Sequence, residues 1–260
     1  MKNTKTSALQ LASGVGAVLL KTLIVAVSLG FILTGAQAAP PVNLIVNGNF
    51  ETGTFVGWTV APGNFGASYA INNGTFAPFG GALPPIDGQF DAVGFQFGPS
   101  LTSLQQTITV PNNVFSAKLS WGDRIRNFSG IFVHPTQEWR VVIRDLSGTL
   151  LYTVFSTNPG DPVLQVGPNF RSADVTSVLQ TLAGQTVVLS FETQATFFFL
   201  TTAVDDVSLL ASILPSSKDD CKDGGWATFV NVNTGVQIFK NQGDCVSFVA
   251  TKGSNPPAHF

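Results

Sequence analysis

Side chains that could bind a polar ligand recur on segments that alternate polar and apolar residues. Arg140 and Arg144 project together from one segment, Glu192 and Gln194 from a second, and Gln96 from a third. If these segments are neighbouring strands, the five side chains form one polar patch on a sheet. The planar fork of arginine binds oxygen acceptors in pairs, which favours a glycan-binding surface. The simpler alternative is a ladder of Arg–Glu ion pairs on a solvated sheet.

A group of acidic residues has the chemistry of a calcium site. Calcium takes six to eight oxygen ligands from carboxylates and backbone carbonyls. Glu51 follows a Gly-Asn turn, and Asp205 and Asp206 are adjacent in the chain without a neighbouring Lys or Arg. A bound cation would offset the repulsion between these carboxylates. The alternative is that one Asp caps a turn and the other faces water.

Two further segments are candidates for contact with a ligand. Residues 123–126, Asp-Arg-Ile-Arg, follow Trp121 near an expected strand end, where binding loops lie, although their charges could also pair locally. Residues 197–200, Phe-Phe-Phe-Leu, cannot all face inward from a strand. One or two of these side chains should therefore be exposed, unless a bulge buries them.

Strands must position these groups. Segments 115–121, 139–145 and 185–192 alternate apolar and polar residues, as strands with one buried face do. Turns rich in Gly, Pro and Asn separate such segments, and the best helix candidate is short, Asp174–Leu182. About ten strands with turns of this kind predict an all-β fold, an antiparallel β-sandwich of jelly-roll type.

The tryptophans of the body are the aromatic rings on which a sugar could stack. Strand parity places Trp121 beside Leu119, and Trp139 beside Val141, on apolar faces. These two rings are therefore predicted to lie in the core rather than on a binding platform, and Trp58 likewise.

Composition excludes several classes of protein. Only 11% of the 260 residues are charged and the formal net charge is −2, which disfavours nucleic acid as a partner. A chain with 22 phenylalanines and few charges does not have the composition of a disordered protein. Two Cys and two His leave little room for a zinc site, which usually needs four such ligands. Because the chain has no G-x-S-x-G, H-E-x-x-H or P-loop motif, we expect no catalytic activity. A hydrolase with paired carboxylates stays formally open.

The N-terminus has the pattern of a targeting segment. Lys2 and Lys5 precede an apolar run, and Ala36-Gln-Ala38 matches the small-x-small pattern of a signal-peptidase site. Residues 1–38 are therefore predicted to be a signal peptide. A retained anchor is the alternative, although the apolar run is shorter than the ~20 residues that span a bilayer. We expect a secreted, extracytoplasmic protein with no membrane span after cleavage.

A change in composition near residue 215 divides the rest of the chain. Residues 39–215 form the predicted jelly-roll body, and residues 216–260 form a small C-terminal module that holds both cysteines. In an oxidising compartment Cys221 and Cys245 most simply form a disulfide bond. Strands expected at 229–239 and 246–250 make the module β-rich.

Both ends of the body resemble a known group of domains. Residues 43–51, Asn-Leu-Ile-Val-Asn-Gly-Asn-Phe-Glu, with Gly57-Trp58, resemble the opening of galactose-binding-like β-jelly-roll domains, which are widespread as carbohydrate-binding modules in secreted bacterial proteins. Residues 203–209, Ala-Val-Asp-Asp-Val-Ser-Leu, resemble their last strand. The resemblance implies that the two ends lie side by side and hold a structural calcium ion through Glu51 and one Asp of the pair 205–206. The tail motif from Cys221 to Trp226 resembles a short C-terminal module of assorted secreted bacterial proteins.

These observations lead to one leading function and two alternatives. The leading hypothesis is an exported, non-catalytic protein that recognises an extracellular polysaccharide or other glycan through the jelly roll. The second is a structural or adhesive protein of the cell surface or matrix, with protein partners. The third is a polysaccharide-active hydrolase, which would need two facing carboxylates in a cleft.

Overall fold

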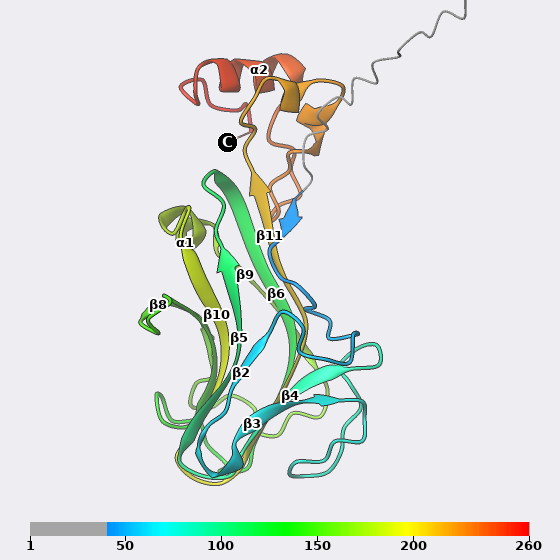
Figure 1. The fold of residues 1–260 in the computed structure, drawn as a ribbon, viewed down its shortest axis with the longest axis vertical. Coiled ribbons are helices and arrows are strands. Elements are labelled where there is room, and N and C mark those ends of the chain that lie inside the picture. Colours follow the sequence, from blue (N-terminus) through cyan, green and yellow to red (C-terminus); the bar gives the residue numbers. More distant parts are fainter. Residues whose placement is uncertain (1–40, 260) are drawn as a thin grey trace, which may run out of the picture. The chain divides into compact units, whose positions relative to one another are not determined.

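Two antiparallel β-sheets face each other as the layers of a sandwich (Figure 1). The computed structural model describes residues 41–259, so the predicted signal peptide lies outside the described residues. The first sheet has the strand order β3-β4-β11-β6-β9, with β1 also paired to β11, and the second has the order β2-β5-β10-β7-β8. The predicted all-β jelly-roll sandwich is confirmed.

The strands and helices have the following bounds. The first sheet consists of β1 (Val42–Asn43), β3 (Ser68–Asn72), β4 (Asp91–Gln96), β6 (Val114–Asn127), β9 (Asn169–Asp174) and β11 (Leu200–Ile213). The second consists of β2 (Thr59–Ala61), β5 (Ser100–Thr109), β7 (Glu138–Arg144), β8 (Leu150–Ser156) and β10 (Thr186–Ala195). The α-helices are α1 (Thr176–Thr181) and α2 (Gln242–Ala250), and short 3₁₀ turns cover Asn64–Gly66, Asp219–Cys221 and Gly225–Thr228.

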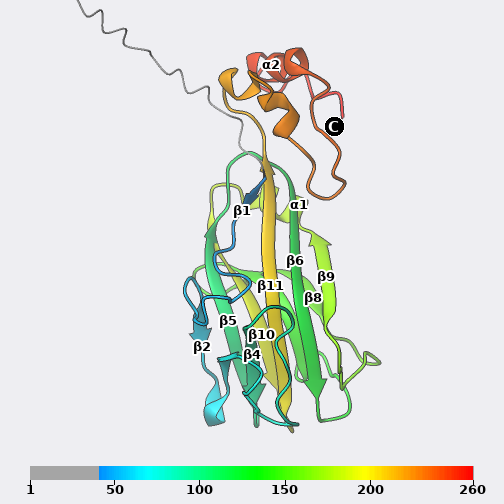
Figure 2. The same ribbon diagram turned by 90° about the vertical axis from the view of Figure 1, so that its right-hand side faces the viewer.

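Strand β11, at the end of the body, lies beside β1 at its start. It pairs with β6 along one edge, and its other edge takes β4 near its start and β1 near its end (Figure 2). A bulge between Asp205 and Ser208 separates these two pairings. At the bulge Val207 donates its N–H to the carbonyl of Gly48 (2.9 Å). A Cβ on Gly48 would lie 1.9 Å from the Val207 oxygen, so only glycine permits this approach. The predicted adjacency of the two ends is confirmed.

The core between the sheets is organised around Phe191. The ring centroid of Phe191 lies 5.9 Å from that of Trp58, 6.4 Å from Trp121 and 6.1 Å from Trp139. All four rings are buried. Large aromatic side chains contribute much of the apolar area that a core buries, so the prediction that the three tryptophans are structural is confirmed.

Two local predictions about the body are also confirmed. The short helix expected within Asp174–Leu182 is α1, which buries Leu179 against the core. In the run 197–200, Phe197 and Phe198 are exposed whereas Leu200 is completely buried. Phe198 has a φ of 57°, so the chain turns sharply there and cannot continue as a strand.

The C-terminal segment contains the predicted disulfide between Cys221 and Cys245, but its secondary structure differs from the prediction. The strand expected at 246–250 is wrong, because these residues belong to helix α2. Asn241 caps this helix by accepting the N–H of Asp244 (2.9 Å). The strands expected at 229–239 are reduced to a single bridge between Val230 and Gln237. An apolar run this short does not distinguish strand from helix by its periodicity.

The C-terminal segment has a small core of its own. Cys221, Cys245, Phe229, Ile238 and Phe239 are buried together there. Polar contacts also tie the segment to the body, since the N–H of Val232 donates to Ser116 Oγ in β6 (3.0 Å). Among residues 41–259, no helix has the length and apolar character needed to cross a membrane.

Candidate functional site

Strands β7 and β10 bring Arg140, Arg144 and Glu192 together on the outer face of the second sheet. Glu192 lies opposite Arg140 in the strand register. Arg140 donates from Nε to Glu192 Oε2 (2.7 Å). Arg144 donates from Nε to Oε1 (2.6 Å) and from Nη2 to Oε2 (2.9 Å) of the same carboxylate. The Glu192 side chain is 1% exposed, against 16% and 17% for the two arginines.

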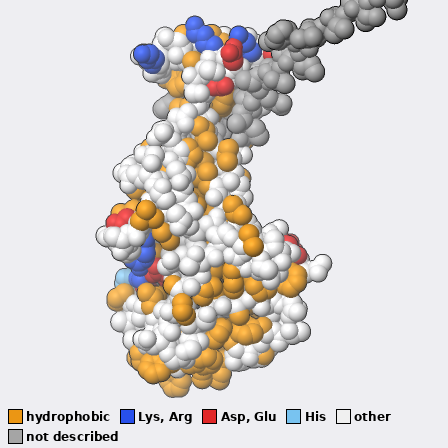
Figure 3. All heavy atoms as spheres, in the orientation of Figure 1, with side chains coloured by type: hydrophobic (Ala, Val, Ile, Leu, Met, Phe, Trp, Pro, Cys, Tyr) orange, Lys and Arg blue, Asp and Glu red, His pale blue; other side chains and the backbone are white. Residues whose placement is uncertain are grey.

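The network continues to Glu138 at the start of β7. Arg140 Nη1 donates to Glu138 Oε1 (2.8 Å), and Ser156 Oγ donates to Oε2 (2.9 Å). His134 Nδ1 lies 2.5 Å from the same Oε2. Glu138 is fully buried whereas the His134 side chain is 61% exposed, so the histidine lies at the solvent edge of the network. Figure 3 shows basic, acidic and histidine side chains gathered at one place on the surface.

The network holds Glu192 ionised. Burial alone would raise the pKa of Glu192, but the hydrogen bonds and charges of Arg144 and Arg140 outweigh this and leave its pKa below the usual value. The hydrogen bond to Glu192 in turn raises the pKa of Arg144. Two guanidinium groups are therefore held in fixed orientations by one buried anion.

The predicted patch is assembled only in part. Gln194 lies opposite Glu138 in the register and is half-buried on the same face. Gln96 belongs to β4 in the other sheet, so its predicted place in the patch is wrong. Its side chain is buried and Nε2 donates to the carbonyls of Gly98 (2.9 Å) and Ala195 (3.0 Å), which closes a loop. A lone Gln between two apolar residues does not reveal its strand's partner.

Sequence reasoning missed Glu138, His134 and Ser156. The signal for Glu138 was present, because it lies two residues before Arg140 and shares its face of the strand. Ser156 comes from β8 and reaches the network only through sheet pairing, as the residue opposite Arg140.

The predicted calcium residues lie around the loop before β4, which Glu51 and Asp205 both contact, with Asp205 and Asp206 at the bulge of β11. Glu51 Oε1 accepts the N–H groups of Gln89 (2.8 Å) and Phe90 (3.0 Å). Asp205 Oδ2 accepts the N–H of Asp87 (3.1 Å). Burial, chiefly, raises the pKa of Asp205 to about 7. Burial also raises the pKa of Asp206, and the charges of Asp87 and Glu51 add to it.

This corner of the molecule carries excess negative charge. The charges of Glu51 and Asp87 both repel Asp206, and neither Glu51 nor Asp206 is in an ion pair within the part of the chain that the structure describes. Among residues 41–259, however, no three or more His, Cys, Asp or Glu side chains form a group arranged to hold a metal ion. Any cation here would need backbone carbonyls to complete its ligands.

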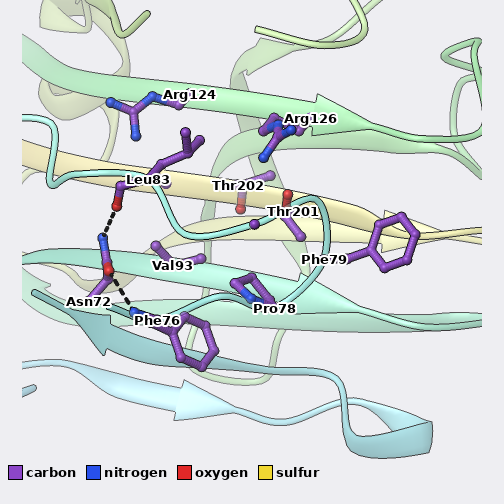
Figure 4. A pocket seen from close by; sticks show the side chains of 12 residues that line it. Asn72, Phe76, Pro78, Phe79, Leu83, Val93, Arg124, Arg126, Thr201 and Thr202 are labelled. Carbon is purple, nitrogen blue, oxygen red and sulfur yellow. Dashed lines mark hydrogen bonds between the residues drawn. The ribbon is translucent and has the colours of Figure 1, made fainter. Parts of the chain in front are cut away.

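A pocket lies on the outer face of the first sheet, beneath the loop between β3 and β4 (Figure 4). Arg124 and Arg126 come from β6, Thr201 from β11, and Phe76 and Phe79 from the loop. The pocket encloses about 30 Å³, which is more than the ~10–15 Å³ that a single water molecule needs. The segment 123–126 is thus part of a strand, and its two arginines face this pocket.

Comparisons with known proteins give no family for this chain and only distant structural similarity. No family model matches the chain, and no curated protein matches it. Among solved structures, TmCBM61 in complex with β-1,4-galactotriose has a TM-score of 0.43 at 14% identity, covering 65% of this chain and 99% of that one. The K1 cleaved adhesin domain of Lys-gingipain from Porphyromonas gingivalis has a TM-score of 0.42 at 15% identity, covering 66% and 98%.

A Stig cyclase from Fischerella has a TM-score of 0.42 at 14% identity, covering 66% of this chain and 98% of its own. A binding module, an adhesin domain and an enzyme are thus similar to this chain to the same degree. This similarity is too distant to transfer a ligand or an activity.

Proposed function

We propose that the chain is an exported, non-catalytic protein that binds a polysaccharide on the outer face of the β5-β10-β7 sheet. The observation that carries the proposal is the pair of guanidinium groups of Arg140 and Arg144, held by the buried carboxylate of Glu192. Replacing a buried ionic network by apolar residues is often neutral or stabilising, so stability is a weak reason for its presence. The N–H groups that these fixed guanidinium groups do not use on Glu138 and Glu192 can donate to the oxygen atoms of a sugar chain.

Neighbouring side chains on the same face support a hydroxyl-rich ligand. In the register, Ser103 lies opposite Glu192, and Gln105 lies opposite Ser190. Hydroxyl and amide groups can both donate and accept hydrogen bonds, as sugar hydroxyls do. Export is supported by the disulfide between Cys221 and Cys245, because such bonds persist in oxidising compartments.

The state of the two carboxylates in this network supports binding rather than hydrolysis on this face. A glycoside hydrolase needs one carboxylic acid that stays protonated and one carboxylate that stays ionised. The pKa of Glu192 is lowered by its two arginines, which does not suit a general acid. Glu138 is buried and already engaged by Arg140 and Ser156.

The proposal is tested with a panel of neutral polysaccharides and two matched variants. Arg144→Lys keeps the charge beside Glu192 but removes the fork, so binding should weaken about tenfold, which is ~1.4 kcal/mol. Arg171→Lys is the control, because Arg171 forms a similar ion pair with Asp123 on the other sheet. Affinity electrophoresis or calorimetry measures binding, and thermal unfolding reports the fold. Equal affinity of wild type and Arg144→Lys, or no binding to any polysaccharide, would contradict the proposal.

The exposed phenylalanines favour the second candidate, an adhesive protein with protein partners. Phe65 is 72% exposed, and Phe197 and Phe198 are 50% and 65% exposed. Exposed apolar side chains that are contiguous, as the neighbours Phe197 and Phe198 are in sequence, can mark an interaction surface. Sedimentation analysis distinguishes the candidates: self-association that Phe65→Ser and Phe198→Ser abolish, without polysaccharide binding, supports adhesion.

We also propose that the acidic corner at Glu51 and Asp206 holds a structural calcium ion. Carboxylates are ligands that calcium prefers, and the repulsion between these two groups supports a site for a cation. A ligand at 100 times its Kd stabilises a fold by ~2.7 kcal/mol, which corresponds to a rise in Tm of about 5–10 °C for a protein of this size.

The calcium proposal is checked by thermal unfolding with calcium and with a chelator. Wild type should melt several degrees higher with calcium, whereas Asp206→Asn should melt at one temperature under both conditions. Asp174→Asn, an exposed carboxylate far along the chain in β9, is the control and should keep the full calcium effect. A wild-type melting curve that the chelator does not change would rule the ion out.

A further inference from the structure

The pocket under the β3–β4 loop contains a buried guanidinium group whose hydrogen bonds are incomplete. Arg124 is 5% exposed, and its Nη1 donates to the carbonyl of Pro84 (2.9 Å). Its Nε has no hydrogen-bond partner within residues 41–259. Buried donors without a partner are rare in proteins, and each calls for an explanation. A bound acceptor in the adjoining pocket would supply one.

The pocket also carries more positive than negative charge. Burial lowers the pKa of Arg124, the charge of Asp91 opposes this, and the neighbouring Arg126 adds to it. Within the described range 41–259, neither arginine forms an ion pair. Asp91 can balance one of the two guanidinium groups and leaves the other without a counter-charge. An anion between the two would remove this repulsion.

The walls of the pocket indicate what kind of molecule carries the anion. Arg126 Nη1 donates to the carbonyl of Gly80 (3.0 Å) in the covering loop. A Cβ on Gly80 would lie 2.5 Å from the ring of Phe128 and 2.9 Å from Arg126 Nη2, so the loop lies directly against this arginine. The ring of Phe79 stacks on Phe199 at 3.7 Å and remains 38% exposed. Figure 4 shows Phe79 at one end of the pocket, and Arg124 and Arg126 along the side that β6 forms.

We propose that this pocket binds the carboxylate of an acidic sugar, with Arg124 and Arg126 holding the carboxylate and the ring of Phe79 offering a face to the sugar. The size of the pocket admits one small group without displacement of the loop. A planar carboxylate matches the fork geometry of arginine. The proposal rests on the glycan-binding function proposed above, and it adds a second site, on the opposite sheet, for a uronic acid unit.

The test compares trigalacturonate with its fully methyl-esterified form, which has the same sugars without the charges. Calorimetry on the full chain measures both ligands against wild type, Arg126→Gln and Lys118→Gln. Lys118 is the matched control, because it lies on the same face of β6 and its loss changes the net charge equally. We expect trigalacturonate to bind wild type and Lys118→Gln alike, at least tenfold more weakly to Arg126→Gln, and the ester to bind at least tenfold more weakly to wild type.

A second measurement needs no variant. The ¹⁵N-resolved Nε–H resonance of Arg124 should shift when trigalacturonate is added to wild type, and should not shift with the ester. Ester that binds as tightly as the acid, an unchanged affinity in Arg126→Gln, or an unmoved Arg124 resonance would each overturn the inference.

The outcomes also separate this inference from the proposed function. Neutral polysaccharide binding that depends on Arg144, with no effect of Arg126→Gln on trigalacturonate, overturns the acidic-sugar site and leaves the function standing. The opposite result is that trigalacturonate binding depends on Arg126, while no neutral polysaccharide binds and Arg144→Lys has no effect. That result supports the acidic-sugar site and contradicts a binding face on the second sheet.

Discussion

At the scale of single residues, neighbouring positions on β10 show how differently buried polar groups can be satisfied. Glu192 accepts hydrogen bonds from Arg140 and Arg144, so its charge is compensated. Ser190, two residues earlier on the same face, has a buried Oγ without a partner in the described part of the chain. Removing the Glu192 carboxylate should destabilise the fold, because both arginines bond to it. The buried Ser190 hydroxyl, in contrast, destabilises the fold while it lacks a partner.

Two variants of β10 should therefore move stability in different directions. Glu192→Gln leaves Arg144 without its counter-charge and Arg140 with Glu138 alone, and should lower the free energy of unfolding by about 3 kcal/mol. Ser190→Ala removes a hydroxyl that lacks a partner and should leave stability unchanged or raise it by up to ~1 kcal/mol. Urea unfolding at neutral pH measures both. A loss of stability in Ser190→Ala would show that its hydroxyl has a partner in solution.

At the scale of elements, the C-terminal segment is a small core closed by one covalent bond. The disulfide joins Cys221 at a 3₁₀ turn to Cys245 in α2, 24 residues later. The five residues of its buried cluster offer little apolar area to offset chain entropy. The local stability of this segment should therefore depend on the disulfide bond more strongly than the stability of the jelly roll does.

The double variant Cys221→Ala/Cys245→Ala tests this dependence. The chain-entropy model assigns about 3–4 kcal/mol to a loop of this length. Amide hydrogen exchange of α2 should accelerate strongly, while amides of β10 and β11 keep their protection, because the sandwich core does not include this cluster. Equal acceleration in both places would mean that the segment and the sandwich unfold as one cooperative unit.

At the scale of the whole molecule, buried carboxylates near β4 and β11 make stability depend on pH. Burial raises the pKa of Asp91 to about 6, against the hydrogen bonds from Asn72 and Ile86. Its pKa in the unfolded chain is near 3.9. The folded state thus binds more protons than the unfolded state between about pH 4 and 6, so that this group lowers stability as pH rises through that window.

The contribution of Asp91 is isolated by comparison with Asp91→Asn. Unfolding free energies at pH 4, 5, 6, 7 and 8, measured with a chelator present, should give a wild-type minus variant difference that falls by about 1–3 kcal/mol from pH 4 to pH 7. Asp220, whose lowered pKa acts in the opposite direction, cancels in this difference. Asp205 adds to the difference in the same direction, because the charge of Asp91 is one of the causes that raise its pKa. A flat difference curve would show that Asp91 has an ordinary pKa.

Strand periodicity alone was sufficient for much of the fold. Alternation in 115–121 and 139–145 predicted strands and placed Trp121 and Trp139 inside, because a pleated strand puts alternate side chains on opposite faces. The same rule put Arg140 and Arg144 together on the outer face. Local rules failed in the C-terminal segment, where 246–250 is a helix, since a short apolar run carries no distinguishing period.

The sequence by itself determined which side chains share a face of each strand, which rings are buried and which cysteines can pair. Only the tertiary structure decided which strands are neighbours: it placed Gln96 on the other sheet, brought Glu138 to Arg140 and Glu192, and covered Arg124 and Arg126 with a loop. The physical reason is that the face on which a side chain lies follows from strand geometry, which repeats every two residues. Pairing between strands depends on packing over the whole sandwich, which no local pattern encodes.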